Sequence, residues 1–227
     1  MIFFRHLFFA GIGLLLLPAI AGMLDTLFFL LVELQSDPVR GQTLLTFLAG
    51  GALWVLIFLF LPHPFRSYVL AHELSHALAA WLSGARVERL RVGKDGGSVE
   101  VSHANLLITL APYMFPFYSL VLLAGTAVAG LVFNLSAWLP FLPFALGFTG
   151  AFHLCFTLLA LSAGQSDIRP YGPLGAYPVI ALGNLLILLA GLMLLSPGDL
   201  PEHLRLLADS LLDFYRTAWN QLDAFRQ

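Results

Sequence analysis

The chain has 227 residues, of which 59% are hydrophobic and 11% are charged, with a mean hydropathy of +0.87. A soluble domain carries about 25% charged residues, so the composition excludes an ordinary soluble protein and predicts an all-α protein that crosses a membrane several times. The net charge of −2 and the lack of a basic run give no reason to expect a nucleic-acid partner. The single cysteine, Cys155, excludes an intramolecular disulfide.

Two apolar runs at the N-terminus predict the first two membrane spans. The first covers residues 7–32, contains Pro18, and carries Asp25, which we interpret as a hydrogen-bonded packing residue. Because the apolar run continues past Pro18 without a clear small-residue cleavage site, it predicts a retained span and not a removed signal peptide. Residues 33–42 predict a polar connection, and residues 43–61 predict the second span, which is followed by two prolines.

Residues 67–83 predict a third, short helix that ends at Gly84. This helix contains the motif His72-Glu73-x-x-His76 among almost wholly apolar residues. Positions four residues apart lie on one face of a helix, so the two imidazoles can bind one metal ion. Glu73 stands where a general base for a metal-activated water would stand. Ionisable residues inside a membrane segment are rare and usually functional, so we interpret the motif as a metal site and not as a chance match.

The most polar internal segment predicts a β-hairpin over residues 86–102. Apolar and polar residues alternate on both sides of the glycine-rich stretch 93–97, as they do in two strands joined by a turn. The edge of such a strand, beside a metal site, could pair with an unwound segment of a substrate.

Three further spans are predicted after the hairpin. The first covers residues 105–133 and contains Pro112 and Pro116, which are tolerated in a membrane where the broken backbone lines a cavity or is packed in protein. The other two cover residues 138–161 and 177–195. We therefore expect about six transmembrane helices.

The C-terminal residues predict an amphipathic helix. From Leu204 to Phe225, apolar residues recur at helical spacing between charged ones, which indicates a helix on the membrane surface or against the bundle. We expect a membrane-embedded domain over residues 1–198, with its core at 66–172, followed by the amphipathic helix at 199–227.

Topology suggests a third metal ligand. A catalytic zinc normally has three protein ligands and one position for water. The helix with the motif and the fifth span are expected to end on the same side of the membrane, so Asp167 would lie at a depth similar to that of His72 and His76. His153 precedes Asp167 by 14 residues, about 21 Å along a continuous helix, and cannot bind the same ion in that geometry. His103 is an alternative ligand.

These features resemble the site-2 protease family of intramembrane zinc metalloproteases, in particular its short bacterial members without a PDZ domain. The matching elements are His72-Glu-Leu-Ser-His76 in an apolar helix, Gly84, the hairpin, Ala111-Pro-Tyr113, and an aspartate at the end of a later span. Many members have Asn-Pro and Asp-Gly elements, whereas Asp167 is followed here by Ile168. The resemblance covers about residues 68–167.

The resemblance implies one Zn²⁺ ion held by His72, His76 and Asp167, with Glu73 as the catalytic residue. The implied reaction is hydrolysis of a peptide bond in or near a transmembrane segment of another membrane protein. The expected partners are that transmembrane substrate and the lipid bilayer. The implied location is the bacterial inner membrane, as an integral, multi-pass protein. The active site is expected nearer the cytoplasmic face because positive charge is densest at the hairpin, at Arg86, Arg89, Arg91 and Lys94.

Other functions predict different features. Another class of membrane zinc protease would use a glutamate as third ligand, but Glu88, Glu100 and Glu202 all fall in the predicted loop or tail. A non-catalytic scaffold or regulator that retains the protease fold would tolerate loss of Glu73 or His76, and both are present. A transporter would favour paired inverted halves, which we do not find.

Overall fold

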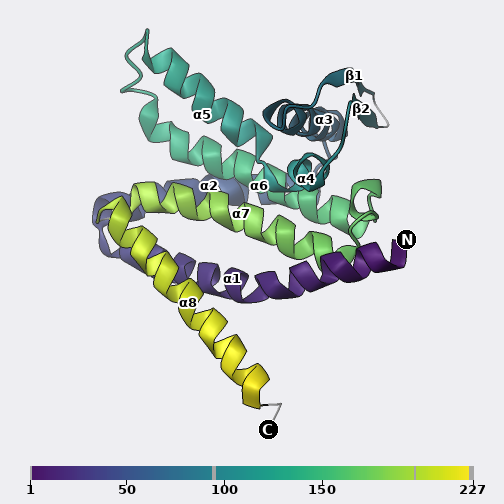
Figure 1. The fold of residues 1–227 in the computed structure, drawn as a ribbon. Helices are drawn as coiled ribbons and strands as arrows, with labels where there is room; N and C mark the ends of the chain where they lie inside the picture. Colours follow the sequence, from purple (N-terminus) through teal and green to yellow (C-terminus); the bar gives the residue numbers. More distant parts are fainter. Residues whose placement is uncertain (1, 94–95, 197, 225–227) are drawn as a thin grey trace. The chain divides into compact units, whose positions relative to one another are not determined.

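The structure, a computed structural model, describes residues 2–93, 96–196 and 198–224 (Figure 1). By its packing the chain forms two compact units, the first of residues 1–42 and 169–227 and the second of residues 43–168. The expected division into residues 1–198 and 199–227 follows other boundaries and stays a prediction. Residues 94 and 95 of the expected hairpin turn, and Phe225 of the expected apolar stripe, lie outside the described residues.

In the first unit, α1 (Ile2–Ser36) packs along α7 (Pro173–Leu195) (Figure 1). Glycine permits this close approach, because a Cβ atom added at Gly13 would overlap the carbonyl oxygen of Leu174. Pro18 lies inside α1, which continues through it as one helix of 35 residues.

The C-terminal helix α8 (Leu200–Ala224) also packs on α1, so it contacts the bundle as one of the two expected positions requires, and a position on the membrane surface stays a prediction. The Ser210 hydroxyl donates a hydrogen bond of 2.8 Å to the Asp25 carboxylate, and the Tyr215 hydroxyl donates one of 2.8 Å to the carbonyl of Leu15. Asp25 is therefore a hydrogen-bonded packing residue, as predicted.

The connection expected at residues 33–42 is much shorter in the structure. Helix α1 continues to Ser36, and α2 (Pro38–Phe60) begins two residues later. The Asp37 carboxylate accepts hydrogen bonds from the amides of Val39 and Arg40, at 2.9 and 3.0 Å, and Pro38 occupies the first helical position. This is the usual chemistry of a helix start, so a single capping residue makes the turn.

The second unit places α2 against α6 (Leu142–Ser162), which follows the short helix η1 (Leu139–Phe141). Glycine again permits the contact, since a Cβ atom at Gly50 would overlap the carbonyl oxygen of Phe144. Trp54 of α2 is buried between Phe152 and Phe156 of α6, with ring centroids 4.8 and 6.4 Å away.

The predicted hairpin is present in the same unit. Helix α3 (Phe65–Leu82) is followed by β1 (Val87–Val92) and β2 (Gly97–Val101), which pair in antiparallel register with Leu90 opposite Val99. The hairpin packs against α3 (Figure 1).

The span expected at residues 105–133 is two helices with a sharp bend between them. Helix α4 (Leu106–Met114) and α5 (Phe117–Gly130) are bent by 80° at the break that contains Pro116. A proline disfavours helical geometry at the residue before it, which explains why α4 stops before Pro116. Pro112, by contrast, lies inside α4.

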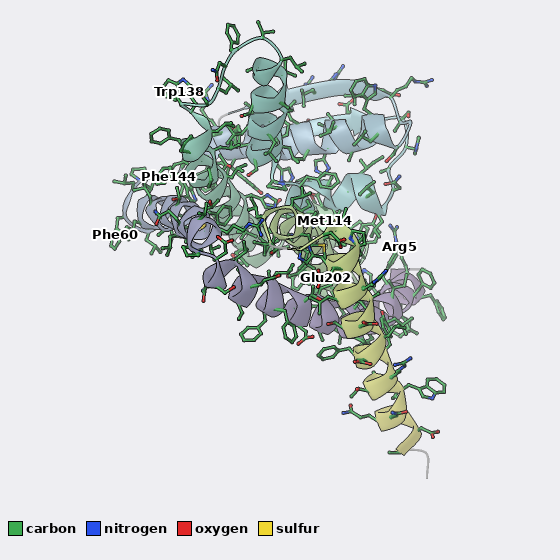
Figure 2. All side chains as sticks on the ribbon, turned by 90° about the vertical axis from the view of Figure 1, so that its left-hand side faces the viewer. Arg5, Phe60, Met114, Trp138, Phe144 and Glu202 are labelled. Carbon is green, nitrogen blue, oxygen red and sulfur yellow. The ribbon has the colours of Figure 1, made fainter. Side chains whose placement is uncertain are left out.

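Among the described residues, four helices are long and apolar enough to cross a membrane, or five if the bent pair counts as one span. The expectation of about six included α3, which has 18 residues and is not among them because Arg66 and the polar motif lower its hydropathy. Large apolar side chains point outward, as Phe60 of α2 does at 78% exposure and Trp138, just before η1, does at 71% (Figure 2). As predicted, the protein is an all-α polytopic membrane protein with a small β-hairpin.

Candidate metal centre

The site is built on α3, whose small residues allow α4 to pack closely against it. Ala79 and Ala80 are fully buried and contact Ile108 and Ala111 of α4. Because side chains four apart share a helix face, His76 points toward the same neighbour as Ala80.

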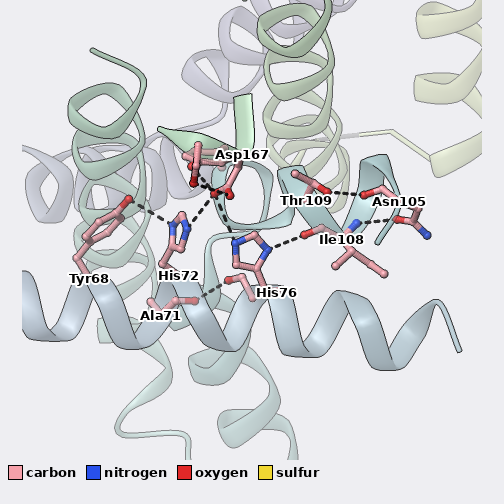
Figure 3. A network of polar contacts seen from close by, with 11 residues as sticks. Tyr68, Ala71, His72, His76, Asn105, Ile108, Thr109 and Asp167 are labelled. Atoms are coloured by element: carbon pink, nitrogen blue, oxygen red, sulfur yellow. Dashed lines mark hydrogen bonds and ion pairs between the residues drawn. The ribbon is translucent and has the colours of Figure 1, made fainter. Parts of the chain in front are cut away.

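His72, His76 and Asp167 come together in the structure. The Oδ2 atom of Asp167 lies 3.3 Å from Nε2 of His72 and 3.6 Å from Nε2 of His76 (Figure 3). One donor atom from each residue lies within 4.8 Å of the other two. Asp167 belongs to the short helix η2 (Ser166–Ile168), which follows four residues after the end of α6.

The second nitrogen of each imidazole has a partner of its own. Nδ1 of His76 lies 2.7 Å from the carbonyl oxygen of Ile108, and this nitrogen must donate because a carbonyl only accepts. Nδ1 of His72 lies 3.3 Å from the hydroxyl of Tyr68. Both Nε2 atoms therefore face the aspartate (Figure 3). Such outer contacts fix the tautomer and the ring orientation of metal-binding histidines.

Asp167 is held as a carboxylate. The Tyr113 hydroxyl donates a hydrogen bond of 2.8 Å to its Oδ2 atom. Burial alone would raise the pKa of Asp167, but hydrogen bonds from His72, His76 and Tyr113 hold it well below its usual range. Two imidazoles and a carboxylate form a donor set that suits Zn²⁺, which would take the place of the protons on Nε2 and leave a fourth position for water.

Glu73 lies beside these residues and against the hairpin. Its side chain is buried, and a Cβ atom added at Gly97 of β2 would lie 2.5 Å from its Cγ and 2.8 Å from its Oε1. Glu73, His72, His76 and Asp167 all line one cleft of about 330 Å³, and β2 forms another part of its wall. The cleft therefore combines a possible base, the three donor residues and a strand.

Comparison with known families bears on the same part of the chain. The family model described as Peptidase M50B-like matches residues 44–164, which is more than half of the sequence. The chain belongs to the Peptidase M50B-like family. This confirms the resemblance to the site-2 proteases and supports a metalloprotease at the level of the family. No curated protein and no solved structure matches the chain significantly.

The alternative ligands of this M50B-like protein lie elsewhere. His153 lines a second, smaller cavity that also contacts His72, and it is not part of the donor group. His103 is exposed, with Nδ1 3.4 Å from the hydroxyl of Ser102. Glu88 and Glu100 are on the hairpin, where Glu100 forms a 3.7 Å ion pair with Arg89. Neither glutamate belongs to the donor group found among the described residues.

Sequence reasoning did not assign roles to Tyr68 or Tyr113. Tyr68 precedes His72 by four residues, so helical spacing already predicts a contact between them. Tyr113 is 54 residues from Asp167, and their hydrogen bond depends on tertiary packing. The only signal for it was its place in the Ala-Pro-Tyr element.

Proposed function

We propose that this protein is an intramembrane zinc metalloprotease, which hydrolyses a peptide bond in or near a transmembrane segment of another membrane protein. The observation that carries the proposal is the cleft itself. In a chain of a peptidase family, it brings Glu73 together with His72, His76 and Asp167.

In this proposal the three donor residues hold one Zn²⁺ ion. When bound, zinc supplies Lewis acidity, which lowers the pKa of a water toward neutrality and polarises the scissile carbonyl. Glu73 accepts a proton from the attacking water, whose oxygen forms a bond to the carbonyl carbon. Glu73 then donates this proton to the amine nitrogen as the carbon–nitrogen bond breaks. A buried carboxylate next to the donor group suits both roles.

The substrate must be locally extended to reach these groups, because a helix hides its carbonyls in internal hydrogen bonds. The β2 strand lines the cleft and pairs with β1 along one edge. In our proposal its other edge pairs with an unwound segment of the substrate, which places a peptide carbonyl in the cleft.

We also propose a location in a bacterial inner membrane, with the active site nearer the cytoplasmic face. The arginines of the hairpin support this orientation, since positive charge in short loops favours the cytoplasmic side. Labelling the cysteine of an Arg89→Cys variant in sealed vesicles tests this orientation. Labelling only from the periplasmic side would contradict it.

The deciding experiment compares cells that express the wild-type chain with cells that express Glu73→Gln or the control Glu202→Gln, whose residue lies in α8, outside the cleft. We expect membrane proteomics to find a transmembrane protein shortened by the wild type and by the control but not by Glu73→Gln. Purified wild type and Glu73→Gln should both contain one zinc per chain. Zinc in both, with identical proteomes, would favour a non-catalytic scaffold or regulator.

A further inference from the structure

The most informative feature outside the donor group is the proline inside α4. In an α-helix, the N–H group of each residue donates to the carbonyl four residues earlier. Pro112 has no N–H group, and its ring also pushes the carbonyl of the residue four positions earlier away from the helix axis. That carbonyl belongs to Ile108. Pro112 therefore leaves the Ile108 carbonyl without its helical donor.

The Ile108 carbonyl is the group that contacts His76. Its oxygen lies 2.7 Å from Nδ1 of His76, which is 32 residues away in sequence (Figure 3). A buried carbonyl without a partner is costly, so this contact satisfies both groups. It also commits Nδ1 to the carbonyl, so that Nε2, on the side of the donor group, is the nitrogen that would bind a metal ion.

The next residue of α4 contacts another member of the group. The Tyr113 side chain is buried, and its hydroxyl donates to Oδ2 of Asp167 at 2.8 Å. Oδ2 is the same atom that lies closest to both imidazoles. A carboxylate oxygen has two lone pairs, so it can accept from Tyr113 and still bind a metal ion. The Tyr113 ring also meets the ring of His72 edge to face, with centroids 5.4 Å apart.

Helix α4 is itself fixed at its start. The Asn105 side chain accepts a 2.8 Å hydrogen bond from the amide of Ile108 and so caps the helix (Figure 3). Ile108 also packs in the cluster that contains Ala79 and Ala80 of α3. The position of the Ile108 carbonyl is thus fixed by the hydrogen bond of its own amide to Asn105 and by the packing of its side chain on α3.

We propose that α4 positions the metal ligands, and that Pro112 and Tyr113 are its two positioning residues. Pro112 acts on His76 by freeing the Ile108 carbonyl, and Tyr113 acts on Asp167 through its hydroxyl. This inference rests on the proposed function, because it assigns these residues to the zinc site. Neither residue is assigned a part in the bond-breaking step.

Zinc affinity tests the proposal without any substrate. We would purify the wild type, Pro112→Ala and Tyr113→Phe in detergent, and measure Zn²⁺ binding by competition with a chromophoric chelator. Loss of an outer contact to a metal ligand typically costs about 10- to 100-fold in affinity, so we expect about a tenfold loss in each variant. In Pro112→Ala the new N–H group competes with His76 for the Ile108 carbonyl.

Two matched controls separate positioning from general damage. Pro178→Ala removes another proline inside a helix, in α7. Tyr118→Phe removes a hydroxyl that donates a hydrogen bond of 2.8 Å to the carbonyl of Ser67. Both should bind Zn²⁺ within about twofold of the wild type, well short of the loss expected at an outer contact. Alanine favours a helix more than proline does, so the unfolding temperature of zinc-free Pro112→Ala should not fall.

The outcomes are distinct. Weaker Zn²⁺ binding by both variants, with zinc-free stability retained, supports the proposal. Wild-type affinity in either variant overturns the role of that residue, and a matched loss of affinity and of zinc-free stability overturns positioning in favour of a purely structural role. A wild-type protein that binds no Zn²⁺ overturns the proposed function together with this inference.

Discussion

Adding one methyl group at Gly97 should damage catalysis while leaving the metal site intact. In Gly97→Ala the new Cβ atom would lie 2.5 Å from Cγ of Glu73 and 2.8 Å from the carbonyl oxygen of Arg91. Carbon atoms pack at about 3.5–4.0 Å, so Glu73 or the hairpin must move by about 1 Å. A displacement of this size in a catalytic group can cost about 100-fold in rate, or about 2.7 kcal/mol in transition-state free energy.

The assay measures kcat/KM for a substrate identified by proteomics, together with zinc content. Gly150→Ala is the matched control, because a Cβ atom there meets nothing within 4 Å. We expect Gly97→Ala to bind zinc normally and to cleave about 100-fold more slowly, whereas Gly150→Ala should behave as the wild type. Cleavage by Gly97→Ala at the wild-type rate would show that the contact between β2 and Glu73 does not control the base.

Three further predictions concern the metal, α4 and α8. Removal of metal with a chelator should abolish cleavage, and added Zn²⁺ should restore it; activity that survives chelation would contradict a zinc mechanism. Asn105→Ala removes the cap of α4 and should lower the free energy of unfolding by about 1 kcal/mol, measured by thermal denaturation, whereas Asn105→Asp should retain stability. Ser210→Ala removes the hydrogen bond to Asp25 and should lower the free energy of unfolding by about 1–2 kcal/mol, measured by thermal denaturation. Its zinc affinity should be unchanged, so weaker zinc binding would contradict this prediction.

The features that could be predicted from the sequence depend on local spacing. His72 and His76 share a helix face because four residues make about one turn, and alternation fixed both strands of the hairpin. Asp167 was predicted to lie near the two histidines by counting spans. Such counting requires only the side of the membrane on which each span ends. The structure has fewer candidate spans than were counted, yet Asp167 still lies next to both histidines, because η2 follows α6 closely.

Other features depend on competition between local signals. The segment 33–42 looked like a loop because it is polar, but a capping aspartate followed by proline starts a helix at once. Pro112 and Pro116 looked alike as helix breakers. Only Pro116 ends a helix, whereas the carbonyl that Pro112 leaves free has another donor in His76. Such a partner cannot be found from the residues near the proline.

The residue whose carbonyl Pro112 leaves free, Ile108, connects the packing of α3 and α4 to the donor group. Ile108 has its side chain in the buried contact between α3 and α4 and its carbonyl on a metal-site histidine. Because the side chain and the carbonyl belong to the same residue, any shift of α4 relative to α3 also moves the carbonyl that contacts His76. Closely packed helices resist such shifts, since Ala79, Ala80 and Ala111 leave little free space between them. The small residues after the His72–His76 motif therefore contribute to the site through the position of α4, although none of them belongs to the donor group.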